Sequence, residues 1–174
     1  MSAEHWKDIV GFEGRYQISD QGRVKSLPFM QRYVLRNGNP AMRKTKERIL
    51  ATQLINSGYR IVHLHLDNSR KALLVHRLVA EAFYDGVDTD VNHKNGCKTE
   101  NSRDNLEWCT RSHNHDHAVD LGLNKQAIKV RLIGGESYPS IARAARLNKT
   151  SIGTITRSAT RRVPTLGGEQ WEYA

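Results

Sequence analysis

The sequence predicts an α+β protein built from small antiparallel β modules, with a strand, loop, strand and helix segment in the middle. A pair of short helices flanked by short strands follows near the C-terminus. Apolar and polar residues alternate over short stretches between turn sequences, which is typical of antiparallel strands. Apolar residues at helical spacing also occur in short segments. The chain has no internal repeat and no low-complexity tract, so these elements form a small mixed fold.

The first part of the chain predicts short antiparallel strands. Within residues 6–27, apolar and polar residues alternate in Tyr16-Gln17-Ile18-Ser19. The following Ser19-Asp20-Gln21-Gly22 has the composition of a hairpin turn. Residues 32–48 are strongly basic and are interrupted by Asn37-Gly38-Asn39-Pro40. That stretch predicts a long loop.

A second hairpin is predicted from the alternation of residues 59–66, a turn at Asp67-Asn68-Ser69 and a strand at residues 72–76. Residues 77–84 place Leu78, Val79, Ala82 and Phe83 at helical spacing, which predicts a short amphipathic helix covering the hairpin. Residues 85–90 predict a loop.

The remaining elements are predicted in the same way. Strands are expected at residues 91–94 and 106–110 around a polar loop, and a helix at 112–121 ends at Gly122. Further along, a strand is expected at 128–133, short helices at 140–147 and 151–157, and a closing strand at 171–173. These elements predict three modules, with boundaries at 1–50, 51–122 and 123–174.

Charge favours a polyanionic partner. Lys and Arg outnumber Asp and Glu by 27 to 18, and the sequence pI is about 9.8. Residues 1–84 hold 14 basic and 7 acidic side chains, residues 85–120 hold 4 and 8, and residues 121–174 hold 9 and 3. Two basic arms therefore flank an acidic middle, a distribution that favours nucleic acid.

No stretch approaches the roughly 18–20 consecutive apolar residues of a membrane span, and residues 1–10 have no apolar signal core. A soluble protein is expected, in the cytoplasm of a phage-infected or bacterial cell. Cys97 and Cys109 are too few for a disulfide framework, which favours a reducing compartment and packing roles for both.

Three segments in the middle of the chain carry a specific pattern of polar residues. They are Val91-Asn92-His93-Lys94-Asn95-Gly96, Asn105-Leu106-Glu107-Trp108 and His113-Asn114. Their order and their strand, loop, strand and helix context resemble the HNH endonuclease motif of phage and intron-encoded homing endonucleases. Residues 75–80 are also similar to the segment that precedes the motif in that subfamily. The resemblance implies a ββα-metal nuclease domain within residues 51–122.

The chemistry of phosphodiester cleavage explains these residue types. A histidine with a pKa near 6.5 accepts a proton from water at neutral pH, which suits His93 as general base. One hard cation, Mg²⁺ or Mn²⁺, takes oxygen ligands, and Asn92 and Asn114 supply amide oxygens. Asn105 is expected to orient the His93 ring by a hydrogen bond and so to complete the catalytic pair.

Other interpretations of these residues stay open. Many family members carry Asp where this chain has Asn92, which leaves metal affinity in question. Asn105 as a turn residue and Asn114 as a helix-surface amide are the simpler alternatives. A zinc site of Cys97, Cys109, His113 and His117 is disfavoured, because structural zinc sites usually take cysteines from a close pair and eleven residues separate these two.

The two basic arms resemble DNA-binding modules. Residues 6–26 look like the small module found beside HNH domains in homing endonucleases. Residues 140–157 resemble the helix-turn-helix repeat of intron-encoded nucleases, whose second helix enters a groove. His76 is either structural or directed at a phosphate. The residues expected to contact DNA are Arg15, Arg23, Lys25, Arg43, Lys44, Lys46, His76, Lys149, Ser151, Thr154, Arg157, Arg161 and Arg162.

The sequence therefore predicts a site-specific DNA endonuclease that uses one divalent cation and a histidine general base and nicks double-stranded DNA as a monomer. The leading alternative is a DNA-binding protein or regulator with an inactive HNH centre. An RNA-binding protein is disfavoured, since no aromatic stacking platform is evident.

Overall fold

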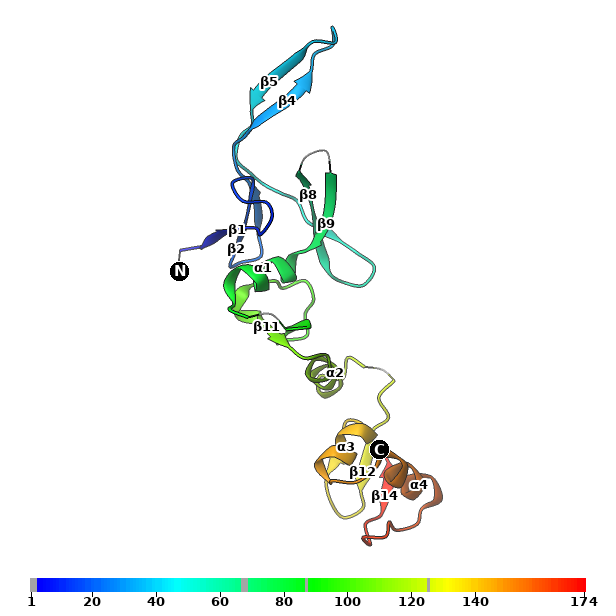
Figure 1. Ribbon diagram of the computed structural model, residues 1–174. Helices are drawn as coiled ribbons and strands as arrows, with labels where there is room; N and C mark the ends of the chain where they lie inside the picture. The colour runs from blue at the N-terminus through cyan, green and yellow to red at the C-terminus, as the bar shows by residue number, and fades with distance from the viewer. Residues whose placement is uncertain (1–2, 67–68, 87, 125) are drawn as a thin grey trace. The chain divides into compact units, whose positions relative to one another are not determined.

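The computed structural model describes residues 3–66, 69–86, 88–124 and 126–174. Within these residues the contacts divide the chain into two compact units, Met1–Thr110 and Arg111–Ala174 (Figure 1). The division by contacts has a single boundary, at residue 110. The three modules expected from the sequence stay a prediction about functional parts of the chain.

The N-terminal strands form an antiparallel sheet in the order β1-β2-β3-β6, as the alternating pattern predicted. Its strands are β1 (Trp6–Asp8), β2 (Tyr16–Ser19), β3 (Val24–Ser26) and β6 (Arg48–Ile49). Ile18 and Val24 are fully buried. The turn between β2 and β3 contains Gly22 at a φ of 75°, a conformation that glycine adopts without steric cost.

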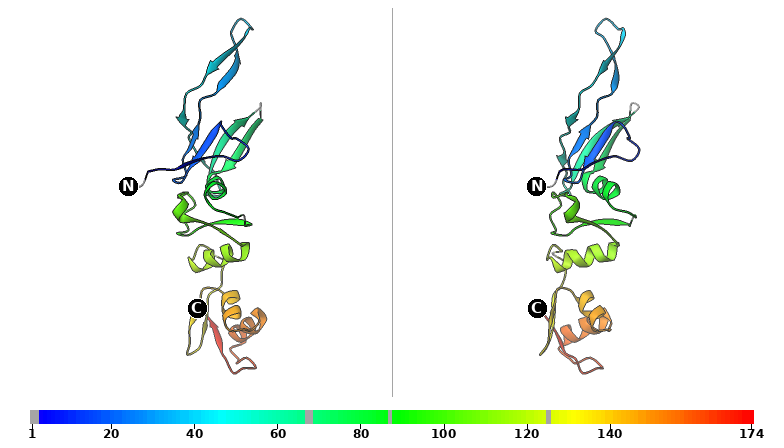
Figure 2. Two further views of the ribbon diagram at one scale, coloured as in Figure 1. Left: turned by 60° about the vertical axis from the view of Figure 1, so that its left-hand side comes forward. Right: turned by 90° about the vertical axis from the view of Figure 1, so that its left-hand side faces the viewer.

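The basic stretch predicted as a long loop is instead a hairpin of β4 (Met30–Val34) and β5 (Pro40–Lys44). Five residue pairs are in register, from Met30 opposite Lys44 to Val34 opposite Pro40. The hairpin extends away from the N-terminal sheet (Figures 1 and 2). Because neither face is buried, the strands lack the apolar alternation by which sequence patterns indicate strands.

A second sheet, in the order β7-β8-β9, leads into the first helix. Its elements are β7 (Gln53–Leu54), β8 (Arg60–Leu66), β9 (Ser69–Leu74) and α1 (Val75–Phe83). Asp67 and Asn68 of the predicted turn lie outside the described residues. His76 was expected at the end of a strand but lies in the first turn of α1. The helix begins earlier because Val75, Leu78 and Val79 all face the core.

The predicted central strands are confirmed as β10 (Asp90–His93) and β11 (Leu106–Cys109), which pair antiparallel. A short 3-10 helix, Arg103–Asn105, leads into β11. One apolar cluster joins these strands to α1 and to both sheets. The N-terminal sheet and the central strands therefore share a core.

The second unit begins with α2 (Arg111–Asp120), the helix predicted after the central strands. A small sheet in the order β13-β12-β14 then packs against the predicted pair of short helices. These elements are β12 (Val130–Leu132), β13 (Ser137–Tyr138), α3 (Ile141–Leu147), α4 (Ile152–Arg161) and β14 (Trp171–Tyr173). Val130, Ile155 and Trp171 are fully buried. The expected α+β fold with flanking strands is confirmed.

In the part of the chain that the structure describes, every helix is too short or too polar to cross a membrane.

Candidate active site

His93 ends β10, directly opposite Leu106 of β11, so the sheet fixes its backbone. The residue is only 5% exposed. Burial lowers the pKa of His93 below its ordinary value, while a hydrogen bond to Asn101 acts in the opposite direction. The neutral, proton-accepting form of the ring is therefore favoured.

The sequence predicted that Asn105 orients the His93 ring. In the structure the ring is held by Asn101 instead. Nε2 of His93 lies 3.1 Å from Oδ1 of Asn101. Asn105 uses its amide on the intervening loop, where Oδ1 accepts from the backbone of Asn95 at 3.1 Å and Nδ2 donates to the Glu100 carbonyl at 2.9 Å. Asn105 faces this loop because it closes the 3-10 helix just before β11. Asn101 is one of several polar residues in this loop, so no sequence pattern indicated that it is buried.

Two aromatic rings pack beside the His93 ring. His76 meets it edge-on, with ring centroids 5.2 Å apart, and Tyr59 packs against His76 at 4.7 Å. The Nζ of Lys98 lies 4.6 Å from the centre of the Tyr59 ring. His76 is 5% exposed, which favours the structural role over contact with a phosphate. The pKa of His76 is lowered from 6.5 to about 4, mainly because the ring is buried. The charges of His93, Arg77 and Lys98 lower it further.

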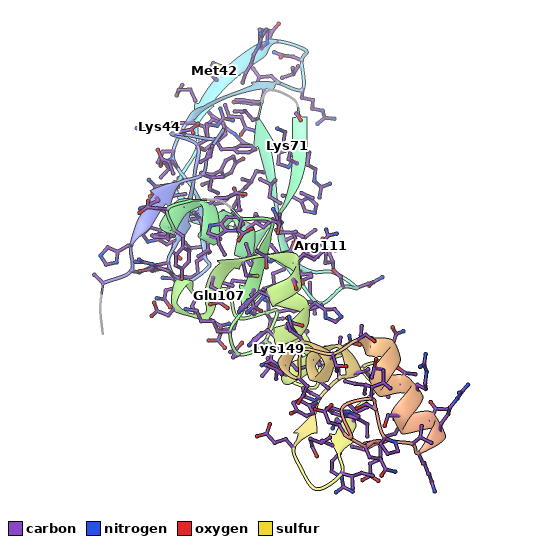
Figure 3. The ribbon with its side chains drawn as sticks, turned by 60° about the horizontal axis from the view of Figure 1, so that its bottom comes forward. Met42, Lys44, Lys71, Glu107, Arg111 and Lys149 are labelled. Atoms are coloured by element: carbon purple, nitrogen blue, oxygen red, sulfur yellow. The ribbon has the colours of Figure 1, made fainter. Side chains whose placement is uncertain are left out.

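Asn92, the residue before His93, pairs with an acidic side chain of β11. Nδ2 of Asn92 donates to Oε1 of Glu107 at 2.7 Å, across the register of β10 and β11 (Glu107 is labelled in Figure 3). This bond turns the Asn92 amide oxygen away from the carboxylate. An amide oxygen and a carboxylate are hard donors of the type that Mg²⁺ and Mn²⁺ prefer, so these residues fit such an ion. Glu107 was not among the expected ligands.

The fourth predicted residue of the site, Asn114, lies on α2 in the second unit. Its role rests on its position in the sequence motif and stays a prediction. Among the described residues no group of three or more His, Cys, Asp or Glu is placed to hold a metal ion. Cys97 is exposed, whereas Cys109 is buried.

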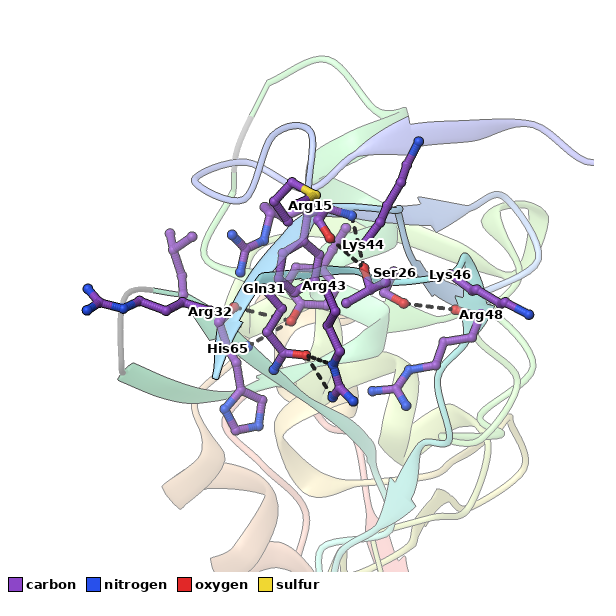
Figure 4. A pocket seen from close by; sticks show the side chains of 14 residues that line it. Arg15, Ser26, Gln31, Arg32, Arg43, Lys44, Lys46, Arg48 and His65 are labelled. Atoms are coloured by element: carbon purple, nitrogen blue, oxygen red, sulfur yellow. Dashed lines mark hydrogen bonds between the residues drawn. The ribbon is translucent and has the colours of Figure 1, made fainter. Parts of the chain in front are cut away.

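A basic hollow of about 820 Å³ lies between the β4–β5 hairpin and β8 (Figure 4). Among the described residues that line it, six are Arg or Lys and none is Asp or Glu. Four of them are predicted DNA contacts, namely Arg15, Arg43, Lys44 and Lys46. The other two, Arg32 and Arg48, were not among the predicted contacts. The guanidinium of Arg15 lies 3.7 Å from the centre of the Phe29 ring, which fixes it at the hollow. The hairpin thus gathers basic side chains that the sequence left dispersed.

The other predicted DNA contacts differ in their surroundings. Arg23 pairs with Glu4, and Lys25 lies 3.6 Å from Glu47 with its side chain only 15% exposed. In the second unit the hydroxyl of Ser151 accepts from the backbone of Thr154, so it caps α4. The remaining four predicted contacts are exposed, and they are Lys149, Arg157, Arg161 and Arg162.

Comparison with known proteins finds matches for two segments of the chain. Residues 4–65 match the NUMOD4 motif, and residues 73–116 match the HNH endonuclease family. The second match contains His93, Asn105 and Asn114 in the order of the motif. The chain therefore contains an HNH endonuclease domain and a NUMOD4 motif. HNH nucleases generally use a divalent metal ion.

The relatives of this chain include viral and phage proteins. An uncharacterized HNH endonuclease of Acanthamoeba polyphaga mimivirus is 31% identical over 97% of this chain and 48% of its own length. The DNA endonuclease I-HmuI of Bacillus phage SP01 is 34% identical over 67% of this chain and 59% of its own length. The chain therefore spans about half the length of these relatives. A solved structure of I-HmuI matches with a TM-score of 0.53 and 27% identity, covering 98% of both chains.

Mild acid is expected to destabilise the fold of the first unit through His76. Because its folded-state pKa is lowered to about 4, the unfolded chain takes up a proton at higher pH than the folded chain. The contribution of His76 to the free energy of unfolding is therefore fully present above pH 6.5 and is lost as the pH drops toward 4. The loss is about 3 kcal/mol, since each pKa unit corresponds to about 1.36 kcal/mol. Urea unfolding across pH 7 to 4 measures the loss.

The variant His76→Phe keeps an aromatic ring without a titrating group, so its stability should change less with pH than that of the parent. The same replacement at exposed His65 is the control. Equal pH dependence in the parent and His76→Phe would show that another group is responsible.

Proposed function

We propose that this protein is a site-specific DNA endonuclease that hydrolyses a phosphodiester bond with one divalent cation and nicks double-stranded DNA as a monomer. The observation that carries the proposal is the buried, hydrogen-bonded His93 at the end of β10, directly after Asn92, whose amide donates to Glu107. The phage relative, whose solved structure is described as showing DNA binding and cleavage, supports DNA as the substrate and a bacterial cytoplasm as the location.

The mechanism begins with His93, whose lowered pKa leaves it neutral near pH 7 and able to take a proton from the attacking water. Asn105 holds the loop that follows β10, and the packed rings of His76 and Tyr59 keep His93 in place. Asn92 and Asn114 would hold the cation, with Glu107 as a further donor. A cation bound there would supply positive charge against the phosphate and the departing 3′-oxygen.

A DNA-binding regulator with an inactive centre is the second candidate, and Asn92 is the observation that favours it. A neutral amide contributes less charge to a cation than a carboxylate at the same position would. Incubating supercoiled plasmid with Mg²⁺ or Mn²⁺ separates the two functions. Nicked product supports the enzyme, and binding without any cleavage supports the regulator.

Substitution of the general base is expected to abolish most of the activity. His93→Ala should lower the cleavage rate by about 10²- to 10⁴-fold, since a positioned base contributes that much, while leaving the DNA dissociation constant nearly unchanged. Single-turnover cleavage and binding titrations measure the two quantities. His5→Ala, on an exposed histidine of the same unit, is the control and should match the parent. Parental cleavage by His93→Ala rejects the assignment.

Metal titrations test the proposed ligands. Asn114→Ala should raise the Mg²⁺ concentration needed for half-maximal cleavage. Asn92→Asp should lower it, because it adds a second carboxylate beside Glu107. Asn39→Asp, which adds the same charge at the tip of the β4–β5 hairpin, is the control. Titrations of both site variants that overlay the parent would contradict the ligand assignment.

The basic hollow is proposed as a phosphate-binding surface. Arg43→Ala should weaken binding to duplex DNA and lower the magnitude of the log–log salt slope by about 0.9 if one phosphate contact is lost. Arg70→Ala removes the same charge from another exposed strand of the same unit and serves as the control. Binding across a salt series gives both slopes. Equal losses in the two variants would mean that the hollow has no special part in binding.

A further inference from the structure

Asn101 connects the candidate general base to the N-terminal sheet. It lies in the loop between β10 and β11 and is 5% exposed. Its Oδ1 is 3.1 Å from Nε2 of His93. On its other side its backbone and Cβ approach the turn at Gly22. Two parts of the chain that are distant in sequence therefore meet at one side chain.

The hydrogen bonds of Asn101 define which ring nitrogen of His93 carries a proton. Nδ2 of Asn101 donates to the Thr99 carbonyl at 3.4 Å, and a carbonyl oxygen can only accept. The amide oxygen therefore faces the histidine ring, and the partner of an amide oxygen must be a donor. His93 is thus protonated on Nε2, and in the neutral ring the lone pair is on Nδ1.

Gly22 allows Asn101 to reach this position. A Cβ built on Gly22 would lie 2.8 Å from the Asn101 carbonyl oxygen and 2.9 Å from the Asn101 Cβ, closer than such atoms approach. The same turn accepts a hydrogen bond at the Asp20 carbonyl from the backbone of Arg103, at 2.7 Å. The turn between β2 and β3 thus packs directly against the loop that carries Asn101.

We propose that Asn101 is a positioning residue that holds His93 in its Nε2-protonated tautomer, and that the Gly22 turn of the N-terminal sheet keeps Asn101 in place. The NUMOD4 region then has a part in cleavage besides any contact with DNA. Nδ1 of His93 is the atom that accepts the proton from water. The inference rests on the proposed function for its effect on cleavage, whereas the tautomer itself can be observed without cleavage.

Nitrogen NMR of the full-length, metal-free protein tests the tautomer directly. With ¹⁵N-labelled histidine at pH 8, the signals of His93 are assigned by their loss in His93→Ala. The parent should show a protonated Nε2 and an unprotonated Nδ1. Asn101→Leu removes the acceptor and should give a mixture of tautomers, whereas Asn101→Asp keeps an oxygen acceptor and should give the parental pattern. A parental pattern in Asn101→Leu overturns the proposal.

Single-turnover cleavage supplies the second measurement. Asn101→Leu should cleave roughly 10- to 100-fold more slowly, the range usual when a partner that orients an active-site residue is lost. Its DNA dissociation constant should stay within about twofold of the parent, because Asn101 is buried. Asn101→Asp should recover most of the rate. Slow cleavage by both variants, with the parental tautomer in both, would overturn the positioning role.

The Gly22 turn has a matched control in Gly14. Both glycines have positive φ, so alanine strains the backbone at each, but among the described residues no atom lies within 4 Å of a Cβ built on Gly14. Gly22→Ala should shift the His93 signals and slow cleavage, and Gly14→Ala should do neither. If Asn101→Leu does not fold, as judged by circular dichroism, Gly22→Ala still tests the inference. If Gly22→Ala and Gly14→Ala give the same His93 nitrogen signals as each other, the inference is overturned.

The two proposals fail in different ways. If the parent never cleaves DNA but its His93 tautomer depends on Asn101 and Gly22, the proposed function is wrong and the positioning inference holds. If the parent cleaves DNA and the tautomer ignores both residues, the function holds and the inference is wrong.

Discussion

The first unit depends on the burial of one face of α1. Val75 and Val79 are fully buried, and the helix contacts β1, β2, β8, β9, β10 and β11. Burying one aliphatic side chain of this size contributes about 1.5–3 kcal/mol. Because the N-terminal sheet and the catalytic strands share this core, they are expected to unfold together. The same packing brings His76 from α1 against His93 from β10.

The second unit is held differently at its first helix. Val119 is the buried residue of α2 among those described, and two ion pairs join the helix to α3. Asp116 lies 2.6 Å from Arg146, and Asp120 lies 3.3 Å from Arg143. The hydrogen bond from Arg146 lowers the pKa of Asp116. Exposed pairs of this kind contribute at most about 1 kcal/mol and weaken in salt. The helix that carries Asn114 therefore combines one buried apolar side chain with two ion pairs to α3.

Sequence patterns predicted those elements that have one buried and one exposed face. The strands β2 and β8 alternate because one face packs on the core, and the helices α1, α3 and α4 show helical spacing for the same reason. The β4–β5 hairpin has no buried face and so no alternation, which explains why it was predicted as a loop. The region was recognised as basic but its arrangement around a hollow was not.

The residues of the candidate active site also fall into those that the sequence could predict and those that it could not. His93 and Asn92 could be predicted because they stand in a recognisable motif and their residue types suit phosphodiester cleavage, and their roles stay predictions. Asn101 and Glu107 could not, since their roles depend on contacts across a loop and across a strand register. Asn105 has a different partner from the one expected, because a side chain one residue before a strand can face either the loop or the ring. Spacing alone does not distinguish those two directions.

The isolation of the β4–β5 hairpin has a consequence for how this protein can change. Its side chains are mostly exposed and make no part of the apolar cluster around α1. Substitutions at exposed positions of this kind usually alter folding stability by less than about 0.5 kcal/mol. The hairpin can therefore accumulate mutations that the core cannot tolerate. Divergence between descendants of this chain should concentrate at the hairpin positions that do not line the basic hollow, leaving β10 and β11 nearly unchanged.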